Sequence, residues 1–89
     1  MKEYVFTYHA RFEMKRRNLS EQIVNKVIEN PEQSWEVRQG RYVFQSRIAM
    51  ESSGNVFLVR VFVDIDKQPP EIVTTYRTSK IEKYWRKEQ

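Results

Sequence analysis

The stretch from Val56 to Val63 limits what this 89-residue chain can fold into more than any other part of its sequence. Every residue in it except Arg60 is apolar, and most are β-branched or aromatic, which favours a strand. A strand that is apolar on both faces must be covered on both sides. We therefore expect a central strand from Val56 to Ile65.

Arg60 interrupts this apolar stretch and needs a partner, because burying an unpaired charge is costly. One interpretation is an ion pair with a carboxylate such as that of Glu71. The other places Arg60 on a concave polar face beside Arg41, Gln45 and Arg47, which share the polar side of the preceding strand. Planar donors along a sheet surface suit phosphate or carboxylate groups, and we favour this second interpretation. Ordinary solvent-facing alternation explains the same residues almost as well.

The apolar periodicity of the chain changes from about 3.6 to about 2 residues after Pro31, which indicates strands. Trp35 and Val37 alternate up to a turn at Gln39-Gly40, and Ser52 to Asn55 predict a hairpin turn. A last strand is expected from Ile72 to Tyr76. In the strand between the two turns we expect one face to carry Tyr42, Phe44, Ile48 and Met50, and the other Arg41, Val43, Gln45 and Arg47.

Two helices are expected before the first of these strands. Thr7 offers a cap for a helix from about Tyr8 to Arg17, and Asn18 breaks its pattern. Ser20 caps a second helix, which Asn30-Pro31 ends. The buried face of this second helix is expected to contain Ile23, Val24, Val27 and Ile28.

A third helix is expected after the last strand. Ser79 and Glu82 have the spacing of a capping box, in which each side chain accepts from the backbone N–H of the other residue. Ile81, Tyr84 and Trp85 then form an apolar stripe at helical spacing. This stripe predicts a C-terminal helix that closes the core.

Together these elements predict one α+β domain covering residues 1–89. Two N-terminal helices pack on one face of a twisted antiparallel sheet of about four strands, and a C-terminal helix follows. Glu3 to Thr7 could add a short edge strand. The core is expected to contain Val27, Ile28, Phe57, Val59, Val61 and Val63.

Composition excludes several classes of protein. The net charge of +4 permits a polyanionic partner. The chain has no cysteine, one histidine and two glycines. These counts argue against a disulfide framework, a cysteine or histidine metal cluster and a glycine-rich phosphate loop, and we expect no metal or cofactor. No secretory signal and no apolar run long enough to span a membrane occur, so a cytoplasmic protein without a membrane partner is expected.

The junction between the last strand and the C-terminal helix gathers cations. Arg77, Lys80 and Lys83 lie around the expected helix start, where free N–H groups favour an anion. Tyr76 and Tyr84 flank this junction, and aromatic rings beside cations can stack single-stranded bases. The alternative is a structural helix with solvated lysines, because structural ion pairs also gather charge.

His9 lies four residues before Glu13 on the first expected helix, a spacing that allows a hydrogen bond. A histidine that titrates near neutral pH can act as an acid or a base. The more ordinary interpretation is a histidine at a helix start whose polar atoms are satisfied locally.

Much of the chain resembles a known family of small bacterial proteins, common in cyanobacteria, that is classed as a domain of unknown function. The blocks that carry the resemblance are Tyr8-His9-Ala10, Met14 with Arg17 to Ser20, Asn30 to Glu32, Gly40 to Ser46, Leu58 to Asp64 and Pro69 to Trp85. This family looks like a relative of the RelE/ParE and BrnT toxins of bacterial toxin–antitoxin pairs. The resemblance implies a compact antiparallel sheet, two N-terminal helices and a C-terminal helix.

The same resemblance implies a toxin of a type II toxin–antitoxin system. RelE-like proteins cleave messenger RNA on the ribosome with Arg, Lys and Tyr side chains, so RNA, a ribosome and an antitoxin are the implied partners. The catalytic candidates are Arg60, Arg77, Lys80, Tyr84 and His9, and the RNA-binding candidates are Arg41, Arg47, Lys83 and Tyr76. ParE-like proteins instead poison gyrase and cut nothing. A non-catalytic protein-interaction or regulatory module of the same fold is therefore the alternative.

Overall fold

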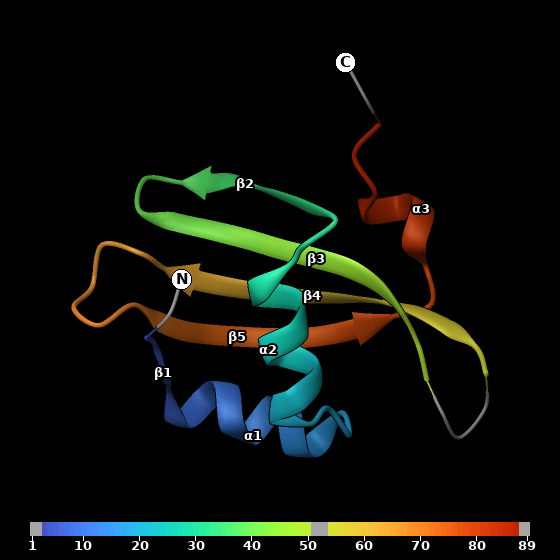
Figure 1. Cartoon of the computed structure of the whole chain (residues 1–89), viewed down its shortest axis with the longest axis horizontal. Helices are drawn as coiled ribbons and strands as arrows, with labels where there is room; N and C mark the ends of the chain where they lie inside the picture. Colours follow the sequence, from blue (N-terminus) through green and yellow to red (C-terminus); the bar gives the residue numbers. More distant parts are fainter. Residues whose placement is uncertain (1–2, 51–53, 88–89) are drawn as a thin grey trace.

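The computed structural model of this chain describes residues 3–50 and 54–87 (Figure 1). The elements in chain order are β1 (Val5–Phe6), α1 (Tyr8–Arg16), α2 (Glu21–Glu29), β2 (Gln33–Arg38), β3 (Arg41–Ala49), β4 (Val56–Asp64), β5 (Glu71–Thr78) and α3 (Ile81–Tyr84). This arrangement confirms the α+β class. None of the helices in the described part of the chain has the length and apolar character needed to cross a membrane.

The sheet has five strands in the order β1-β5-β4-β3-β2, with β4 at its centre as its apolar sequence predicts. The prediction of about four antiparallel strands is wrong in one respect, because β1 pairs with β5 in parallel and makes the sheet mixed. The backbone N–H groups of Val5 and Thr7 donate to the carbonyl groups of Pro70 and Ile72, which holds β1 at the edge. β1 lies within the short edge strand expected from Glu3 to Thr7, but the sequence carries no signal for the parallel direction of its pairing.

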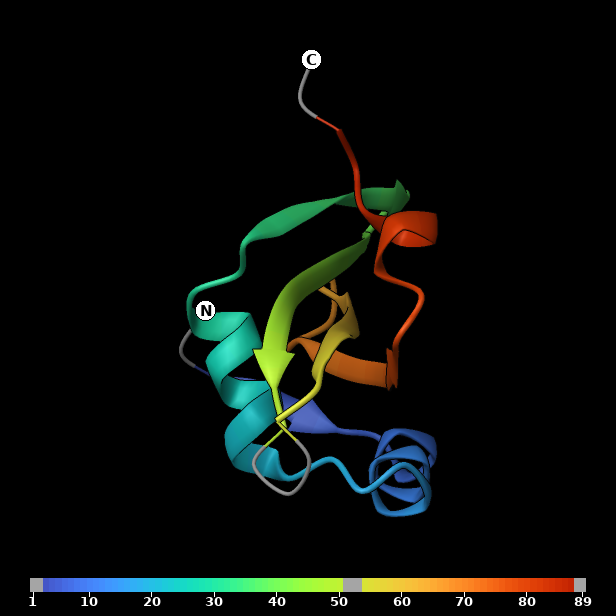
Figure 2. The same cartoon turned by 90° about the vertical axis from the view of Figure 1, so that its right-hand side faces the viewer.

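The two N-terminal helices share one core cluster with one face of the sheet, whereas α3 lies on the other side, which corrects the prediction that the C-terminal helix closes the core. Figure 2 shows α2 and α3 on opposite sides, while α1 lies next to β5. The sheet faces explain this separation. Leu58, Arg60 and Phe62 of β4 project away from α2, and Tyr84 of α3 packs against that face.

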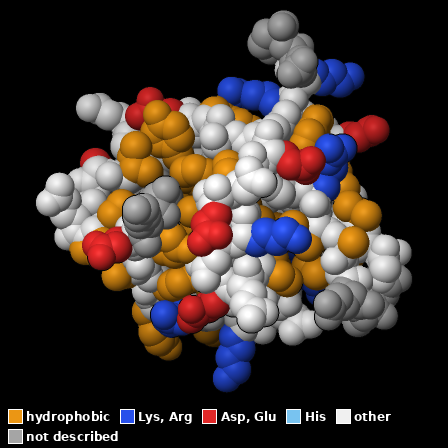
Figure 3. Space-filling model, in the orientation of Figure 1, with side chains coloured by type: hydrophobic (Ala, Val, Ile, Leu, Met, Phe, Trp, Pro, Cys, Tyr) orange, Lys and Arg blue, Asp and Glu red, His pale blue; other side chains and the backbone are white. Residues whose placement is uncertain are grey.

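The main core lies between α1, α2 and the near face of the sheet. Val59, Val61 and Val63 of β4 are fully buried against Ala10 and Val24 of the helices. The predicted core residues are confirmed as buried, except that Phe57 is only partly buried and packs at the margin of the core. On the α2 side, Lys and Arg side chains are scattered among acidic and apolar ones rather than gathered in one patch (Figure 3).

The caps of the two N-terminal helices form as predicted. Thr7 Oγ1 accepts from the backbone N–H of Ala10 at 3.1 Å, and Ser20 Oγ accepts from that of Ile23 at 3.2 Å. Asn18 interrupts the helical conformation between α1 and α2, because its backbone has a left-handed φ of 57°.

The predicted capping box at α3 is wrong. Lys80, not Ser79, is the N-cap residue, and no side chain caps the helix. The helix is a single turn, since Trp85 already has an extended backbone with ψ of 128°. A single turn aligns too few peptide dipoles to make the anion site that the sequence suggested.

The two faces predicted for β3 agree with its register with β4, and Phe44, Ile48 and Met50 pack in or against the main core. On the face predicted to be polar, Val43 and Gln45 are fully buried. The turn at Gly40 has a left-handed φ of 83°, which glycine adopts at little cost. Of the second predicted turn, Ser52 and Ser53 lie outside the described residues, while Gly54 has a φ of 73°.

Candidate functional site

The register of three strands places Gln45, Arg60 and Tyr76 in one row across the sheet. Gln45 of β3 is opposite Arg60 of β4, and Arg60 is opposite Tyr76 of β5. Because side chains alternate along a strand, this row lies on the face away from Val59 and Val61, opposite α2. The sheet itself therefore brings the central arginine together with two polar side chains.

Arg60 is almost completely buried, with 8% of its surface exposed. Its Nε donates to Gln45 Oε1 at 2.8 Å and its Nη1 donates to the Tyr76 hydroxyl at 2.9 Å. No carboxylate of residues 3–50 or 54–87 forms an ion pair with it. The expected alternative partner, Glu71, lies at the other end of β5 opposite Asp64. Within the described residues, the hydrogen-bond partners of the charged guanidinium are therefore neutral side chains.

Four aromatic rings surround the Arg60 guanidinium and form what we call the Arg60 cage. The ring centroids lie 4.6, 5.2, 5.9 and 6.0 Å from Arg60 Cζ for Tyr84, Phe62, Tyr76 and Trp35. Ring faces attract a cation, and the attraction grows when water is excluded, so the cage offsets part of the cost of burying the charge. The sequence singled out Tyr76 and Tyr84 but gave no indication of Phe62 or Trp35.

One nitrogen of the Arg60 guanidinium, Nη2, has no hydrogen-bond partner in the described residues. Within the described part of the chain, every buried side-chain nitrogen or oxygen has a hydrogen-bond partner. Arg60 Nη2 donates to no group of these residues and is not among their completely buried atoms. A guanidinium nitrogen with an unused donor is suited to binding an anion.

Two glutamine side chains hold the C-terminal segment over the cage. Gln45 Nε2 donates to the Tyr84 carbonyl at 3.2 Å and to Gln33 Oε1 at 2.7 Å. Gln33 in turn donates to the Arg86 carbonyl at 2.5 Å and accepts from the Arg86 N–H at 3.1 Å. Sequence reasoning missed Gln33. Its pairing with Gln45 depends on the β2–β3 register, which the sequence does not reveal.

Three further cations lie around the cage. Arg86 Cζ is 4.2 Å from the Trp35 centroid, Lys83 Nζ is 5.4 Å from that of Tyr84, and Arg17 Cζ is 5.7 Å from that of Tyr76. Arg86 and Lys83 form no ion pair with the described acidic residues, whereas Arg17 pairs with Glu13 at 2.9 Å. The face around the cage therefore has an excess of positive charge.

Each of the two arginines of β3 forms an ion pair with a carboxylate. Arg41 makes a bidentate pair with Asp64 at 2.6 and 3.0 Å, and this hydrogen bonding lowers the pKa of the Asp64 carboxyl. Arg47 pairs with Glu32 at 2.9 Å and likewise lowers the pKa of Glu32, while its guanidinium also lies over Trp85. Both predicted RNA-binding arginines thus already have carboxylate partners.

The remaining predicted catalytic residues lie elsewhere. Arg77 is opposite Val59 and so projects to the α2 side, where its Nε donates to the Arg17 carbonyl at 3.1 Å. His9 is exposed on α1, and no hydrogen bond joins it to Arg60. Lys80 is exposed at the start of α3. Of the predicted set, the structure brings together Arg60, Tyr76 and Tyr84, with Lys83 beside them.

The fold and this face define a small α+β domain with a cationic, aromatic surface. Residues 6–77 match the family described as "Domain of unknown function (DUF4258)", and the chain belongs to this family. The matched residues include Arg60 and Tyr76 and end before Tyr84. No match was found among the curated proteins or among the solved structures.

Proposed function

We propose that this protein is the toxin of a type II toxin–antitoxin pair and that it binds and cleaves single-stranded RNA on the face of the Arg60 cage. The observation that carries the proposal is a buried guanidinium with no carboxylate partner in the described residues and with no hydrogen-bond partner there for Nη2. A phosphate oxygen that accepts from Nη2 would supply the missing negative charge. Arginine binds phosphate well because its planar donors remain charged at every physiological pH.

The surroundings of Arg60 support RNA over a small anion. Trp35 and Tyr84 are each partly exposed, and their rings can stack unpaired bases. Lys83 and Arg86 stand beside these two rings and can contact neighbouring phosphates of the same strand. A chain of alternating phosphates and bases fits such a mixture of cations and rings better than an isolated ion does.

The chemistry of cleavage needs a cation and a proton carrier at the same phosphate. The 2′-oxygen of one nucleotide forms a bond to the adjacent phosphorus, and the bond from phosphorus to the 5′-oxygen breaks. Arg60 would stabilise the charge that grows on the phosphate oxygens. The Tyr76 hydroxyl, which is hydrogen-bonded to Arg60 Nη1, is placed to exchange a proton with the reacting oxygens.

Binding of a labelled single-stranded RNA at two salt concentrations tests the proposal. If Arg60, Lys83 and Arg86 contact phosphates, affinity should fall about twentyfold between about 50 and 200 mM salt through counterion release. Arg60→Lys and Arg86→Ala should each weaken binding and abolish growth inhibition on expression. Lys67→Ala removes an exposed cation from the β4–β5 loop and should change neither. Equal RNA affinity of the parent protein and these three variants, with unchanged melting temperatures, would mean that RNA binds elsewhere or does not bind specifically.

A second candidate function is a non-catalytic interaction module. The observation in its favour is a cavity of about 470 Å³ on the α2 side, which includes Arg77 and not Arg60. A protein that acts through this cavity would show little salt-dependent RNA binding. Its interactions would respond to Arg77→Ala and not to Arg60→Lys.

A further inference from the structure

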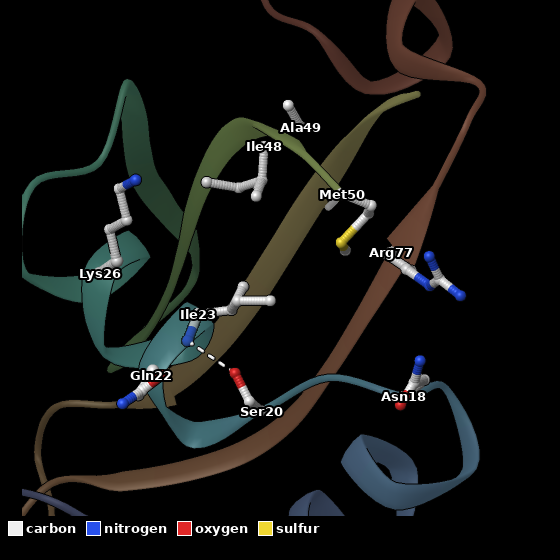
Figure 4. Close-up of a pocket in the computed structure, with 9 residues that line it drawn as sticks. All are labelled: Asn18, Ser20, Gln22, Ile23, Lys26, Ile48, Ala49, Met50 and Arg77. Atoms are coloured by element: carbon white, nitrogen blue, oxygen red, sulfur yellow. Dashed lines mark hydrogen bonds between the residues drawn. The ribbon is translucent and has the colours of Figure 1, made fainter. Parts of the chain in front are cut away.

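A groove runs between α2 and the last residues of β3, on the side of the sheet away from the Arg60 cage. Its larger part is the cavity of about 470 Å³, and an adjoining hollow of about 290 Å³ shares Lys26, Ile48 and Ala49 with it. Figure 4 shows Ile23, Ile48 and Met50 between Lys26 at one end and Arg77 at the other. We call this the α2–β3 groove. Its floor has the apolar side chains of Ile23, Ile48 and Met50 with a cation at each end, and Asn18, Ser20 and Gln22 complete the lining of the larger part.

The edge of β3 is open along this groove. Pairing between β2 and β3 stops at Gln33 and Gln45, whereas β3 continues to Ala49. The Gln45 carbonyl accepts from the Glu32 N–H at 3.0 Å, and the Arg47 N–H donates to Glu32 Oε1 at 2.8 Å. The backbone groups of Gln45 and Arg47 therefore face the β2 side.

Ala49 continues this alternation, because every second residue of a strand directs its backbone groups to the same side. Its N–H and C=O thus face the part of the β3 edge beyond Gln45, where β2 no longer pairs with β3 and no other strand of the described residues does. Unpaired backbone groups at a sheet edge are a template for a further strand. The groove therefore offers main-chain hydrogen bonds as well as a side-chain floor.

The charge of the groove indicates the chemistry of its occupant. Neither Lys26 nor Arg77 forms an ion pair within residues 3–50 and 54–87. Glu32, which lines the smaller hollow, is already paired with Arg47. The groove thus presents two uncompensated positive charges on either side of apolar side chains.

We propose that the α2–β3 groove docks an extended acidic segment of a partner protein, which adds a short strand to the open edge of β3. Apolar side chains of the segment contact Ile23, Ile48 and Met50, and carboxylates beside them pair with Lys26 and Arg77. Main-chain hydrogen bonds to Ala49 give affinity, and the alternate side chains give specificity, as in other cases of strand addition.

Two other occupants fit less well. RNA would gain little from an aliphatic floor that offers no aromatic ring for stacking bases. A second copy of this chain paired through the same edge would bring the positive charges of two grooves together, which is unfavourable across strands. The acidic protein segment satisfies both the floor and the charges.

The test uses a fluorescent, end-blocked peptide of about six residues, a usual strand length, that alternates glutamate with valine. We expect saturable binding to the intact protein by fluorescence anisotropy at low salt, and no binding of the peptide with lysine in place of glutamate. Lys26→Glu and Arg77→Glu should each weaken binding at least about tenfold, because each opposes a carboxylate with a like charge. Lys67→Glu, the same reversal at an exposed site outside the groove, should leave affinity unchanged.

Two further variants separate strand addition from simple charge attraction. A peptide N-methylated at alternate residues cannot donate to the β3 edge and should bind at least about tenfold more weakly. Ala49→Pro removes the outward N–H and should do the same while the protein melts normally, since proline is tolerated at strand edges. Lys26 is exposed, so Lys26→Glu remains informative even if Arg77→Glu lowers the melting temperature.

Three results would overturn the proposal. The first is equal affinity of the glutamate peptide for the parent protein, Lys26→Glu and Ala49→Pro. The second is displacement of the bound peptide by single-stranded RNA, which would make the groove part of an RNA surface. The third is a dimer of the parent protein in sedimentation that Lys26→Glu dissociates, which would make a second copy the occupant.

Discussion

The guanidinium of Arg60 lies over the ring of Tyr84, with Cζ 4.6 Å from the ring centroid. This contact joins the centre of the sheet to the last helix, because Arg60 is on β4 and Tyr84 ends α3. Arg60 is the only buried charged side chain among the described residues. The contact with the C-terminal segment therefore offsets part of the cost of desolvating the Arg60 guanidinium.

Tyr84→Ala should destabilise the protein by about 2 kcal/mol, because it removes a desolvated cation–π contact and the edge-to-face pair with Tyr76. Urea unfolding measures this change. Tyr84→Phe keeps the ring and should stay close to the parent protein. Tyr8→Ala, at a side chain that is 88% exposed, should change stability by no more than about 0.5 kcal/mol. Equal stability of Tyr84→Ala and Tyr8→Ala would mean that α3 does not hold the cage closed.

Gln45→Leu should cost about 2 kcal/mol, because it leaves the buried Nε of Arg60 without its acceptor. It also removes the donor to the Tyr84 carbonyl, so amide hydrogen exchange in α3 should become faster. Gln22→Leu on the exposed face of α2 is the matched control and should leave both measurements unchanged. Slow exchange in α3 of the Gln45→Leu protein would show that the rings alone hold the segment.

The parts of the fold that the sequence predicted are those with a long periodic signal. The apolar run of β4, the buried face of α2 and the alternation of β3 each repeat over several residues and depend on local patterning. The weak alternation from Glu3 to Thr7 indicated β1 as a short edge strand, but its parallel pairing could not be predicted, because its partner in β5 is distant in the chain. The predicted C-terminal helix was longer than the observed one, because local spacing suggested a capping box and a helical stripe that includes Trp85. In the structure, Trp85 and Arg86 make tertiary contacts and lie outside the helix.

The site was only partly predictable for a related reason. Sequence spacing grouped Arg77 with Lys80, yet neighbouring residues of a strand face opposite sides of the sheet, and Arg77 follows Tyr76 directly. Whether Tyr76 or Arg77 lies opposite Arg60 depends on the register between β4 and β5, which includes an irregularity between Phe62 and Val63. No local pattern in the sequence reports such a register.

The helix caps give a second comparison between pattern and structure. Thr7→Ala and Ser20→Ala should each cost about 1 kcal/mol, because each removes the acceptor of a free N–H in the first turn of a helix. Ser79→Ala should have almost no effect, since Ser79 caps no helix. Thermal or urea unfolding of the three variants measures the difference. A cost at Ser79 equal to that at Ser20 would restore the capping box that the sequence suggested.

Val61→Ala should cost about 2 kcal/mol or more through lost burial and the cavity left behind. Val61 is fully buried at the centre of β4, in contact with the helices through the main core. Val37→Ala on the edge strand β2 is the same change at a side chain that is 41% exposed, and it should cost far less. A loss below about half a kcal/mol at Val61 would mean that this part of β4 is not in the core.

The pair of Arg41 and Asp64 predicts a specific dependence of stability on pH. The hydrogen bonds from Arg41 lower the pKa of Asp64 in the folded protein below its usual value of about 3.9. A carboxyl whose folded pKa is lowered stabilises the protein above its unfolded pKa, and this stabilisation is lost as the pH falls through the folded pKa. Asp64→Asn should therefore be less stable than the parent protein at neutral pH, with a difference that shrinks below about pH 4 and disappears at lower pH.

Urea unfolding of the parent and Asp64→Asn proteins between neutral and acidic pH measures this difference directly. The comparison isolates Asp64, because Glu13 and Glu32, whose pKa values are also lowered by arginines, are present in both proteins. Glu82→Gln removes an exposed carboxylate that forms no ion pair in the described residues, and at neutral pH it should change stability by no more than about 0.5 kcal/mol. A difference for Asp64→Asn that persists unchanged into acid would mean that the aspartate acts through the shape of its side chain and not through its charge.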